Sequence, residues 1–327
     1  MNRTAGISRS HRLEQQRHTF AVCIGGATLA ATLGGWIPSS AVAWMIAVVA
    51  IAVGLPHGAL DIMIGPRLAK PQLFFGLYLA GVVGVVLVWL AAPAFGLVAF
   101  FISSWYHFAR GDADHHRDLG RAGKLLGMST AGCAVGLPLA LHAGVVTPVL
   151  SDLMLGSAAL TSPQVSLFGS LIAVPSLAAG MVASVAALRN RRYSALVEIV
   201  TIALVAAFVH PLISFALYFA LWHAPRHLIT LDIDRQSWWR AVGVTAVTLL
   251  AGAWISQLVE PTSPAAARVV FIGLAALTGP HLVITELVRS RQAPQQNPNS
   301  GRIVQSKDGQ RGVASPTWHR SRASSRS

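Results

Sequence analysis

Residues 211–229 read PLISFALYFALWHAPRHLI, an apolar and aromatic run that ends in His223 and His227. The run is close to the roughly 20 residues that a helix needs to cross a bilayer. In a helix, positions i and i+4 share one face, and this spacing lets two imidazoles bind one metal ion. Pro225 lies between the two histidines and removes a backbone donor, which predicts a kink. The stretch therefore predicts a membrane helix with a histidine-bearing end.

Further apolar runs repeat this pattern along the chain. Charged residues make up only 11% of the 327 residues, whereas soluble domains carry about 25%. We therefore expect an all-α, polytopic membrane helix bundle with about ten transmembrane helices. The other predicted segments are 20–37, 41–58, 72–92, 94–109, 123–143, 165–188, 194–209, 240–259 and 266–286.

The placement of Lys and Arg predicts the orientation of the bundle. With the N-terminus inside, 24 of the 25 Lys and Arg fall in inner loops or in the tails, and only Arg268 falls on an outer turn. Because basic residues accumulate in cytoplasmic loops, both termini are predicted to be cytoplasmic, in a multi-pass protein of the cell inner membrane. The net charge of +13 is spread over these loops and tails, so it does not indicate a nucleic-acid partner.

Composition divides the chain into three parts. Residues 1–19 form a basic tail, residues 20–290 the transmembrane domain, and residues 291–327 a basic tail rich in Gln, Asn, Ser and Gly that is predicted to be disordered. Residues 41–43 (AVA) also resemble a signal-peptide cleavage site, but the apolar run before them is longer than the usual core of about 7–15 residues. Cys23 and Cys133 lie in apolar segments and are read as small buried side chains.

Three more predicted segments end in a histidine: His57, His107 and His281. The segments that carry these residues, and the one that carries His223 and His227, all run from the outside to the inside. All five histidines therefore lie at the cytoplasmic half of the membrane. Because ionisable groups are costly in a bilayer, this shared level predicts that they cluster for a function.

Carboxylates occur close to some of these histidines. Asp61 follows His57 by four residues and either accepts the second ring N–H of His57 or is a headgroup-level charge. Asp112 follows His107 by five residues and is expected to support His107 as Asp61 supports His57. Glu198 lies within a predicted segment near its inner end, either as a hydrogen-bond acceptor or as a charge that snorkels to the surface.

The remaining histidines are assigned by their position. His281 is a fifth ligand, a substrate-pocket residue or a core histidine with its own partner. His115 and His116 lie in a charged loop and are expected to be solvated. His142 and His210 are near outer ends, and the others, in the tails, are His11, His18 and His319.

Four or five neutral imidazoles with few carboxylates favour iron, copper or zinc as the metal. Zinc with an open position would suit hydrolysis, but no His-Glu-x-x-His motif accompanies the His223–His227 pair. Iron with open positions suits dioxygen chemistry, which an apolar and water-poor pocket assists by excluding side reactions.

Four motifs resemble the Brp/Blh family of β-carotene 15,15′-dioxygenases, membrane enzymes that supply retinal to microbial rhodopsins. The resemblance covers about residues 41–290, with the motifs in the order of the family. One departure is Ala109, where the family pattern has glycine after His-Phe. The motifs are Pro56-His57-Gly58-Ala-Leu-Asp61, His107-Phe108 with Asp112, Tyr218-Phe219-Ala-Leu-Trp222-His223-Ala-Pro-Arg226-His227, and Pro280-His281.

The resemblance implies a non-haem Fe(2+) centre that cleaves the central 15,15′ double bond of β-carotene with O2 and gives two retinal molecules. It implies His57, His107, His223 and His227 as the metal ligands and a catalytic role for the domain 20–290. The implied partners are β-carotene, O2, membrane lipid and a retinal-binding rhodopsin as the recipient. Aromatic residues expected to line the polyene tunnel are Phe101, Trp105, Tyr106, Phe215, Tyr218, Phe219 and Trp222.

Other classes of protein also place histidines in a membrane. The alternative kept open is a membrane carotenoid-binding or transport protein with a histidine-lined metal site. Membrane desaturases and hydroxylases carry several histidine boxes, whereas this chain has one His-x-x-x-His. A metal permease would place polar groups through the whole depth of the membrane, whereas these histidines share one level.

Overall fold

The computed structural model describes residues 14–16, 19, 20, 22, 52–231, 234–259 and 263–292, and these residues contain helices and no strand. Most of the predicted segments 20–37 and 41–58, residues 41–43, Cys23, most of both tails and the tail histidines lie outside the described residues. Contacts divide the chain into Met1–Leu287 and Val288–Ser327. The second unit contributes only the last turn of one helix to the described part, so the account below concerns the first.

The described helices follow the predicted segments from residue 72 onward, which confirms the all-α class. An additional helix, α8, lies between two predicted segments, and its 11 residues are too few to cross a bilayer. In chain order the elements are α3 (Pro56–Ala59), α4 (Asp61–Ile64), η1 (Gly65–Arg67), α5 (Pro71–Ala91), α6 (Pro93–Asp114), η2 (Arg117–Leu119), α7 (Arg121–Leu141), α8 (Ala143–Leu153), α9 (Ser162–Arg189), α10 (Tyr193–Phe208), α11 (Pro211–Leu217), η3 (Tyr218–His223), α12 (Ala224–Leu231), α13 (Arg235–Val259) and α14 (Ser263–Gln292).

Among the described residues, five helices are long and apolar enough to cross a membrane: α5, α7, α9, α13 and α14. The α5 helix has an apolar surface that is largely uncovered, and Leu77, Leu79 and Leu87 are each more than half exposed. An exposed apolar surface of this extent on a helix of 21 residues suits contact with lipid rather than with water.

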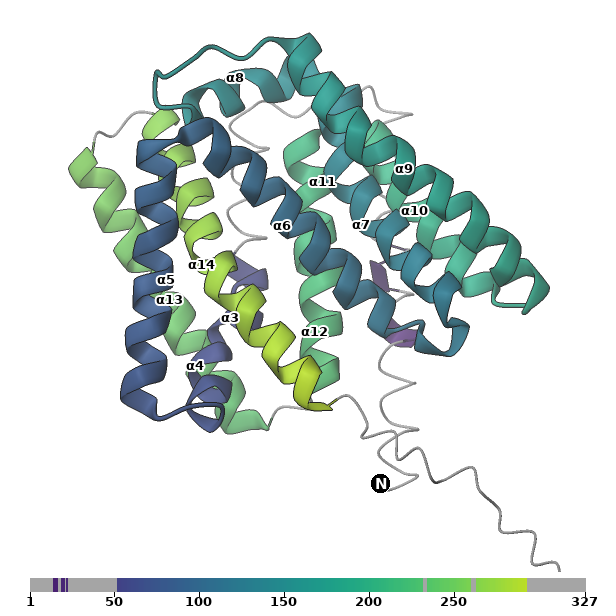
Figure 1. Cartoon of the computed structure of the whole chain (residues 1–327), viewed down its shortest axis with the longest axis horizontal. Coiled ribbons are helices and arrows are strands. Elements are labelled where there is room, and N and C mark those ends of the chain that lie inside the picture. Colours follow the sequence, from purple (N-terminus) through teal and green to yellow (C-terminus); the bar gives the residue numbers. More distant parts are fainter. Residues whose placement is uncertain are drawn as a thin grey trace, which may run out of the picture. The chain divides into compact units, whose positions relative to one another are not determined.

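Helix α7 lies among α6, α9 and α10 (Figure 1) and contacts all three. Its contact with α9 depends on small residues. A methyl group at Gly132 would collide with the Ser176 side chain, and one at Gly136 would come within 2.7 Å of the Ala173 backbone nitrogen. Small residues let helix backbones approach closely, which is how membrane helices pack without a hydrophobic driving force.

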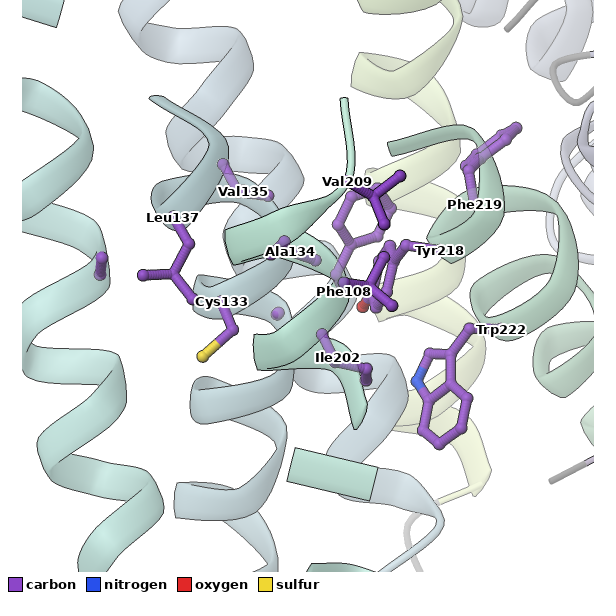
Figure 2. Close-up of a cluster of buried hydrophobic side chains, with 14 of the residues drawn as sticks. Phe108, Cys133, Ala134, Val135, Leu137, Ile202, Val209, Tyr218, Phe219 and Trp222 are labelled. Carbon is purple, nitrogen blue, oxygen red and sulfur yellow. The ribbon is translucent and has the colours of Figure 1, made fainter. Parts of the chain in front are cut away.

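Figure 2 shows a buried apolar cluster where α6, α7, α10 and η3 meet, with Phe108, Tyr218, Phe219 and Trp222 on one side. Cys133 belongs to the same cluster, is buried and is free of any disulfide. The reading of Cys133 as a small buried side chain is therefore confirmed. The cluster fixes α6 against η3, and these two elements carry His107 and His223.

The helix that begins at Pro211 continues through η3 into α12 without a break. Residues Tyr218–His223 form a π-helical turn, which inserts an extra residue into the helical repeat and is frequent at functional sites. Helix α12 contacts both α3 and α6, and α13 packs against α3 (Figure 1). Segments far apart in the sequence are thereby brought to one place.

Candidate metal centre

Three histidines from three separate elements converge in the interior. His57 on α3, His107 on α6 and His223 on the π-helical turn each offer a ring nitrogen, and these nitrogens all lie within 4.8 Å of one another. Each of the three residues is at most 5% exposed. Buried neutral imidazoles that face each other are a donor set for a transition metal.

The tightest approach joins His107 Nε2 and His223 Nε2, which are 3.2 Å apart. Two nitrogens bound to one ion at about 2.1 Å lie about 3 Å apart when they are neighbours in its coordination shell. The pair therefore already has the spacing of adjacent ligands. His107 Nδ1 is buried and has no hydrogen-bond partner among the described residues.

His57 shows how a ligand tautomer is selected by a hydrogen bond. Its Nδ1–H donates to the carbonyl oxygen of Gly54, one turn earlier. The proton is therefore on Nδ1, and Nε2 keeps the lone pair that a metal requires. The proposed partner of His57 was Asp61, and this expectation is wrong because Asp61 binds a different histidine.

His281, on α14, is the histidine that pairs with Asp61. Its Nδ1–H donates to Asp61 Oδ2 at 2.9 Å, and its Nε2 is buried with no partner among the described residues. A carboxylate on one ring nitrogen with the other nitrogen unpaired is the usual environment of a metal-binding histidine. His281 therefore has its own partner in Asp61, while its unpaired Nε2 also fits a ligand or a substrate-pocket residue.

His227 extends the group of rings on α12. Its ring centroid lies 5.6 Å from that of His57, 5.5 Å from that of His281 and 6.4 Å from that of His223. The rings of His223 and His227 are nearly parallel, at 18°, as expected for two residues on one helical face. All five histidines that the sequence placed at one level therefore lie together.

Asp112 binds residues of the π-helical turn; it was expected to bind His107. The hydroxyl of Tyr218 donates to Asp112 Oδ2 at 3.1 Å, and the indole N–H of Trp222 donates to Oδ1 at 3.1 Å. The hydroxyl of Thr130 adds a third bond at 2.6 Å. Asp112 is 1% exposed, and a buried carboxylate needs such donors to be tolerated. Because Tyr218 and Trp222 belong to the same π-helical turn as His223, Asp112 fixes the turn that carries this histidine.

Arg226 is the positive charge at the centre of this network. It is 2% exposed, its guanidinium lies 3.4 Å from the ring centroid of Trp222, and its Nη2 donates to Glu198 Oε1 at 2.9 Å. Glu198 also binds His116 Nε2 at 2.8 Å. Glu198 is thus an acceptor and not a snorkelling charge, and the expectation that His116 is solvated is wrong. A buried pair of this kind is costly to break, because one charge is left uncompensated.

One apolar cavity adjoins the histidines directly, and a second reaches Phe108, whose ring contacts that of His223. The Phe215 cavity, of about 150 Å³, is lined by Phe101, Phe108 and Phe215 among others and reaches His210. The His281 cavity, of about 230 Å³, is lined by His57, His281 and Phe219 among others. Phe215 and Phe219 stack with their centroids 5.8 Å apart, so one aromatic pair separates the two spaces.

Of the aromatic residues predicted to line the polyene tunnel, some line one of the two cavities and others have different contacts. Phe101 and Phe215 line one cavity and Phe219 lines the other. Tyr218 and Trp222 instead serve the Asp112 network, and Tyr106 is 46% exposed on the surface of α6. Trp105 donates its indole N–H to the carbonyl of Met128 at 3.3 Å.

The described part of the protein is all-helical, contains five apolar helices of membrane-spanning length, and includes a buried group of histidines that could hold a metal ion; these features define the class of membrane proteins with a candidate metal site. Residues 48–289 match the family model of β-carotene 15,15′-dioxygenase, and the chain belongs to this family of carotenoid-cleaving dioxygenases. It is similar to a protein described as β-carotene 15,15′-dioxygenase from uncultured marine bacterium 66A03, with 26% identity over 264 residues, 75% of this chain and 93% of that protein. No solved structure matches the chain.

Proposed function

We propose that this protein cleaves β-carotene with dioxygen at its central 15,15′ double bond and releases two molecules of retinal. Family membership supports the reaction, and the observation that carries it to this chain is the convergence of the buried ring nitrogens of His57, His107 and His223 beside an apolar cavity that His57 also lines. The atoms balance: the double bond breaks completely, and each half of the hydrocarbon receives one oxygen atom of O2.

The proposed metal is Fe(2+), held by His57, His107, His223 and His227. The unpaired Nε2 of His281 supports the fit, because a buried imidazole nitrogen without a partner is costly unless an ion takes its lone pair. The set is rich in neutral nitrogen, which suits a borderline metal such as iron. We propose His281, oriented by Asp61, as a fifth imidazole of the same centre. Iron(II) supplies, when bound, the one-electron chemistry that makes O2 reactive toward an alkene.

The residues of this chain supply the remaining requirements. Phe108, Phe215 and Phe219 form apolar walls next to the imidazoles: the ring centroids of Phe108 and His223 are 4.5 Å apart, and those of Phe219 and His57 are 5.4 Å apart. Such walls hold a polyene and exclude water. We place one half of β-carotene in the Phe215 cavity and the other in the His281 cavity, so that the central double bond faces the histidines.

The membrane setting belongs to the same proposal. We place the chain in the cell inner membrane with about ten spans and both termini in the cytoplasm, because basic residues accumulate on the inner side. Five described helices have the length and composition of spans. β-Carotene resides in the bilayer, so an embedded enzyme meets it at high local concentration. Retinal released there would be available to a retinal-binding rhodopsin.

The test is expression in bacteria that accumulate β-carotene, followed by pigment extraction and chromatography. Loss of β-carotene with formation of retinal is expected for the wild type and not for His223→Ala at equal membrane expression. Unchanged pigment in both would refute cleavage of β-carotene. Co-purification of intact β-carotene with the protein would then favour the carotenoid-binding alternative.

A further inference from the structure

The His281 cavity contains hydroxyl groups beside its histidines. Thr245 and Thr248 on α13 and Thr278 on α14 all line it together with His57 and His281. A hydrocarbon polyene forms no hydrogen bonds, so the presence of each of these hydroxyl groups needs an explanation.

Two of the three hydroxyls are occupied within their own helices. Thr248 donates to the carbonyl of Val244 at 2.9 Å, and Thr278 donates to the carbonyl of Leu274 at 2.7 Å. These are the back-bonds to position i−4 that threonine commonly forms in helices. Neither group is left to bind a molecule in the cavity as a donor.

Thr245 differs from its two neighbours. Its hydroxyl is buried and has no hydrogen-bond partner among the residues that the structure describes, and the residue is 5% exposed. Buried polar atoms are nearly always paired, so an unpaired one calls for a ligand or an ordered water. The back-bond available to Thr248 and Thr278 is not made by Thr245, which leaves its O–H group free to donate.

The chemistry of the proposed reaction supplies a matching acceptor. β-Carotene contains no oxygen, so Thr245 cannot contribute a hydrogen bond to substrate binding. Each retinal product carries an aldehyde oxygen, and this oxygen is on the carbon that lay next to the histidines. Thr245 lines the cavity that His57 and His281 also line, so its hydroxyl would share this cavity with an aldehyde formed at the histidines.

We infer that the His281 cavity is a binding site for a polyene aldehyde, in which Thr245 donates a hydrogen bond from its hydroxyl to the carbonyl oxygen of the retinal half formed there. The inference rests on the proposed function and extends it to the product. Thr245 is then a residue that distinguishes oxygen-bearing product from hydrocarbon substrate. A neutral hydrogen bond to a buried carbonyl corresponds to an affinity difference of about 3- to 10-fold.

The first experiment measures equilibrium binding of all-trans-retinal to the full chain in lipid nanodiscs without added metal. Thr245→Val keeps the β-branched shape and removes only the hydroxyl, and we expect its Kd for retinal to rise about 3- to 10-fold. Thr248→Val is the matched control, because its hydroxyl already bonds to Val244. The carbonyl stretch of bound retinal should be lowered by the hydrogen bond in the wild type and in Thr248→Val, and should return to its unbonded frequency in Thr245→Val.

The second experiment uses the iron-loaded protein with β-carotene as substrate. Thr245→Val should raise the inhibition constant of retinal by the same factor as its Kd. Equal retinal affinity and equal carbonyl frequencies in the wild type, Thr245→Val and Thr248→Val would overturn the inference even if β-carotene is cleaved. A wild type that binds retinal through Thr245 but does not cleave β-carotene would instead overturn the proposed function alone.

Discussion

His281 donates a hydrogen bond to Asp61 at 2.9 Å across 220 positions of the sequence. The bond joins α14 to α4 and fixes the tautomer of His281, whose other nitrogen, Nε2, remains unpaired in the interior. It also explains how an acidic side chain that is 1% exposed is tolerated next to a group of imidazoles. Helix α4 and the last described helix, α14, are thus joined at the candidate metal centre.

Asp61→Asn should weaken iron binding about 10- to 100-fold, because an outer partner that orients a ligand histidine and raises its basicity is worth that much in metal affinity. The measurement is a titration of the purified protein with iron(II) in competition with a chromogenic chelator. Asp114→Asn is the matched control, since Asp114 pairs with Arg117 in an exposed part of the protein. Equal affinity in both variants would exclude His281 from the centre.

His57→Ala, His107→Ala and His223→Ala should each lose bound iron and retinal formation while still inserting into the membrane. The reason is that each supplies one of the three converging nitrogens. Elemental analysis of the purified variants gives the iron content, and removal of iron from the wild type by a chelator should reproduce their loss of activity. His142→Ala should keep iron, because His142 binds the carbonyl of Ala207 away from the centre. If a variant retains its full iron content, the substituted histidine is not a metal ligand.

Asp112→Ala should lower the free energy of unfolding by about 3–5 kcal/mol, since it breaks a buried charged network by removing one partner. Tyr218, Trp222 and Thr130 would lose their shared acceptor. Thermal unfolding in detergent, followed by circular dichroism, measures the change. The comparison variant is Asp118→Ala, which breaks the largely exposed pair with Arg192 and should cost about 0–1 kcal/mol. Similar losses in the two variants would contradict a structural role for Asp112.

Gly136→Ala should destabilise the protein by about 1–3 kcal/mol through overpacking. The added methyl group would meet backbone atoms of α9, which cannot move aside as a flexible side chain can. Gly84→Ala on α5 is the control, because nothing lies within 4 Å of its added methyl group; it should be neutral or stabilising by up to about 1 kcal/mol. Thermal unfolding of both variants decides the matter, and equal stabilities would refute the close α7–α9 contact.

Truncation after about residue 291 should leave retinal formation nearly unchanged. The removed tail is rich in polar and basic residues and lies outside the described residues, and such composition cannot bury enough apolar surface to fold. Product analysis in the β-carotene-accumulating host, at matched expression, is the measurement. A large loss of activity would show that the tail supports the membrane domain.

The positions of the helices and of the histidines were predictable from sequence because apolar runs and their ends are local signals. Spans such as 72–92 coincide with helices, and the shared level of the histidines follows from the alternation of basic loops. The partners of the carboxylates were not predictable in this way. Asp61 lies one helical turn from His57 in sequence but binds His281, because the chain breaks into the short helices α3 and α4 between the two residues.

The buried network beneath the histidines shows the same limit. A charged loop sequence predicts solvation for His116, yet α10 brings Glu198 to it and buries both. The residues Tyr218–His223 form a π-helical turn just before Pro225, which the sequence pattern does not predict. Both outcomes depend on packing between segments that are far apart in the chain, and a local pattern carries no information about that packing.

The Phe215 cavity and the His281 cavity have different linings. This difference affects how a symmetrical substrate binds and how its two products leave. β-Carotene has identical halves, but the Phe215 cavity ends at His210 whereas the His281 cavity presents threonine hydroxyls. Two chemically identical products would therefore form in different surroundings and dissociate from the protein at different rates. A single turnover would release retinal in two phases, and a carotenoid altered at only one end would be threaded in a preferred direction.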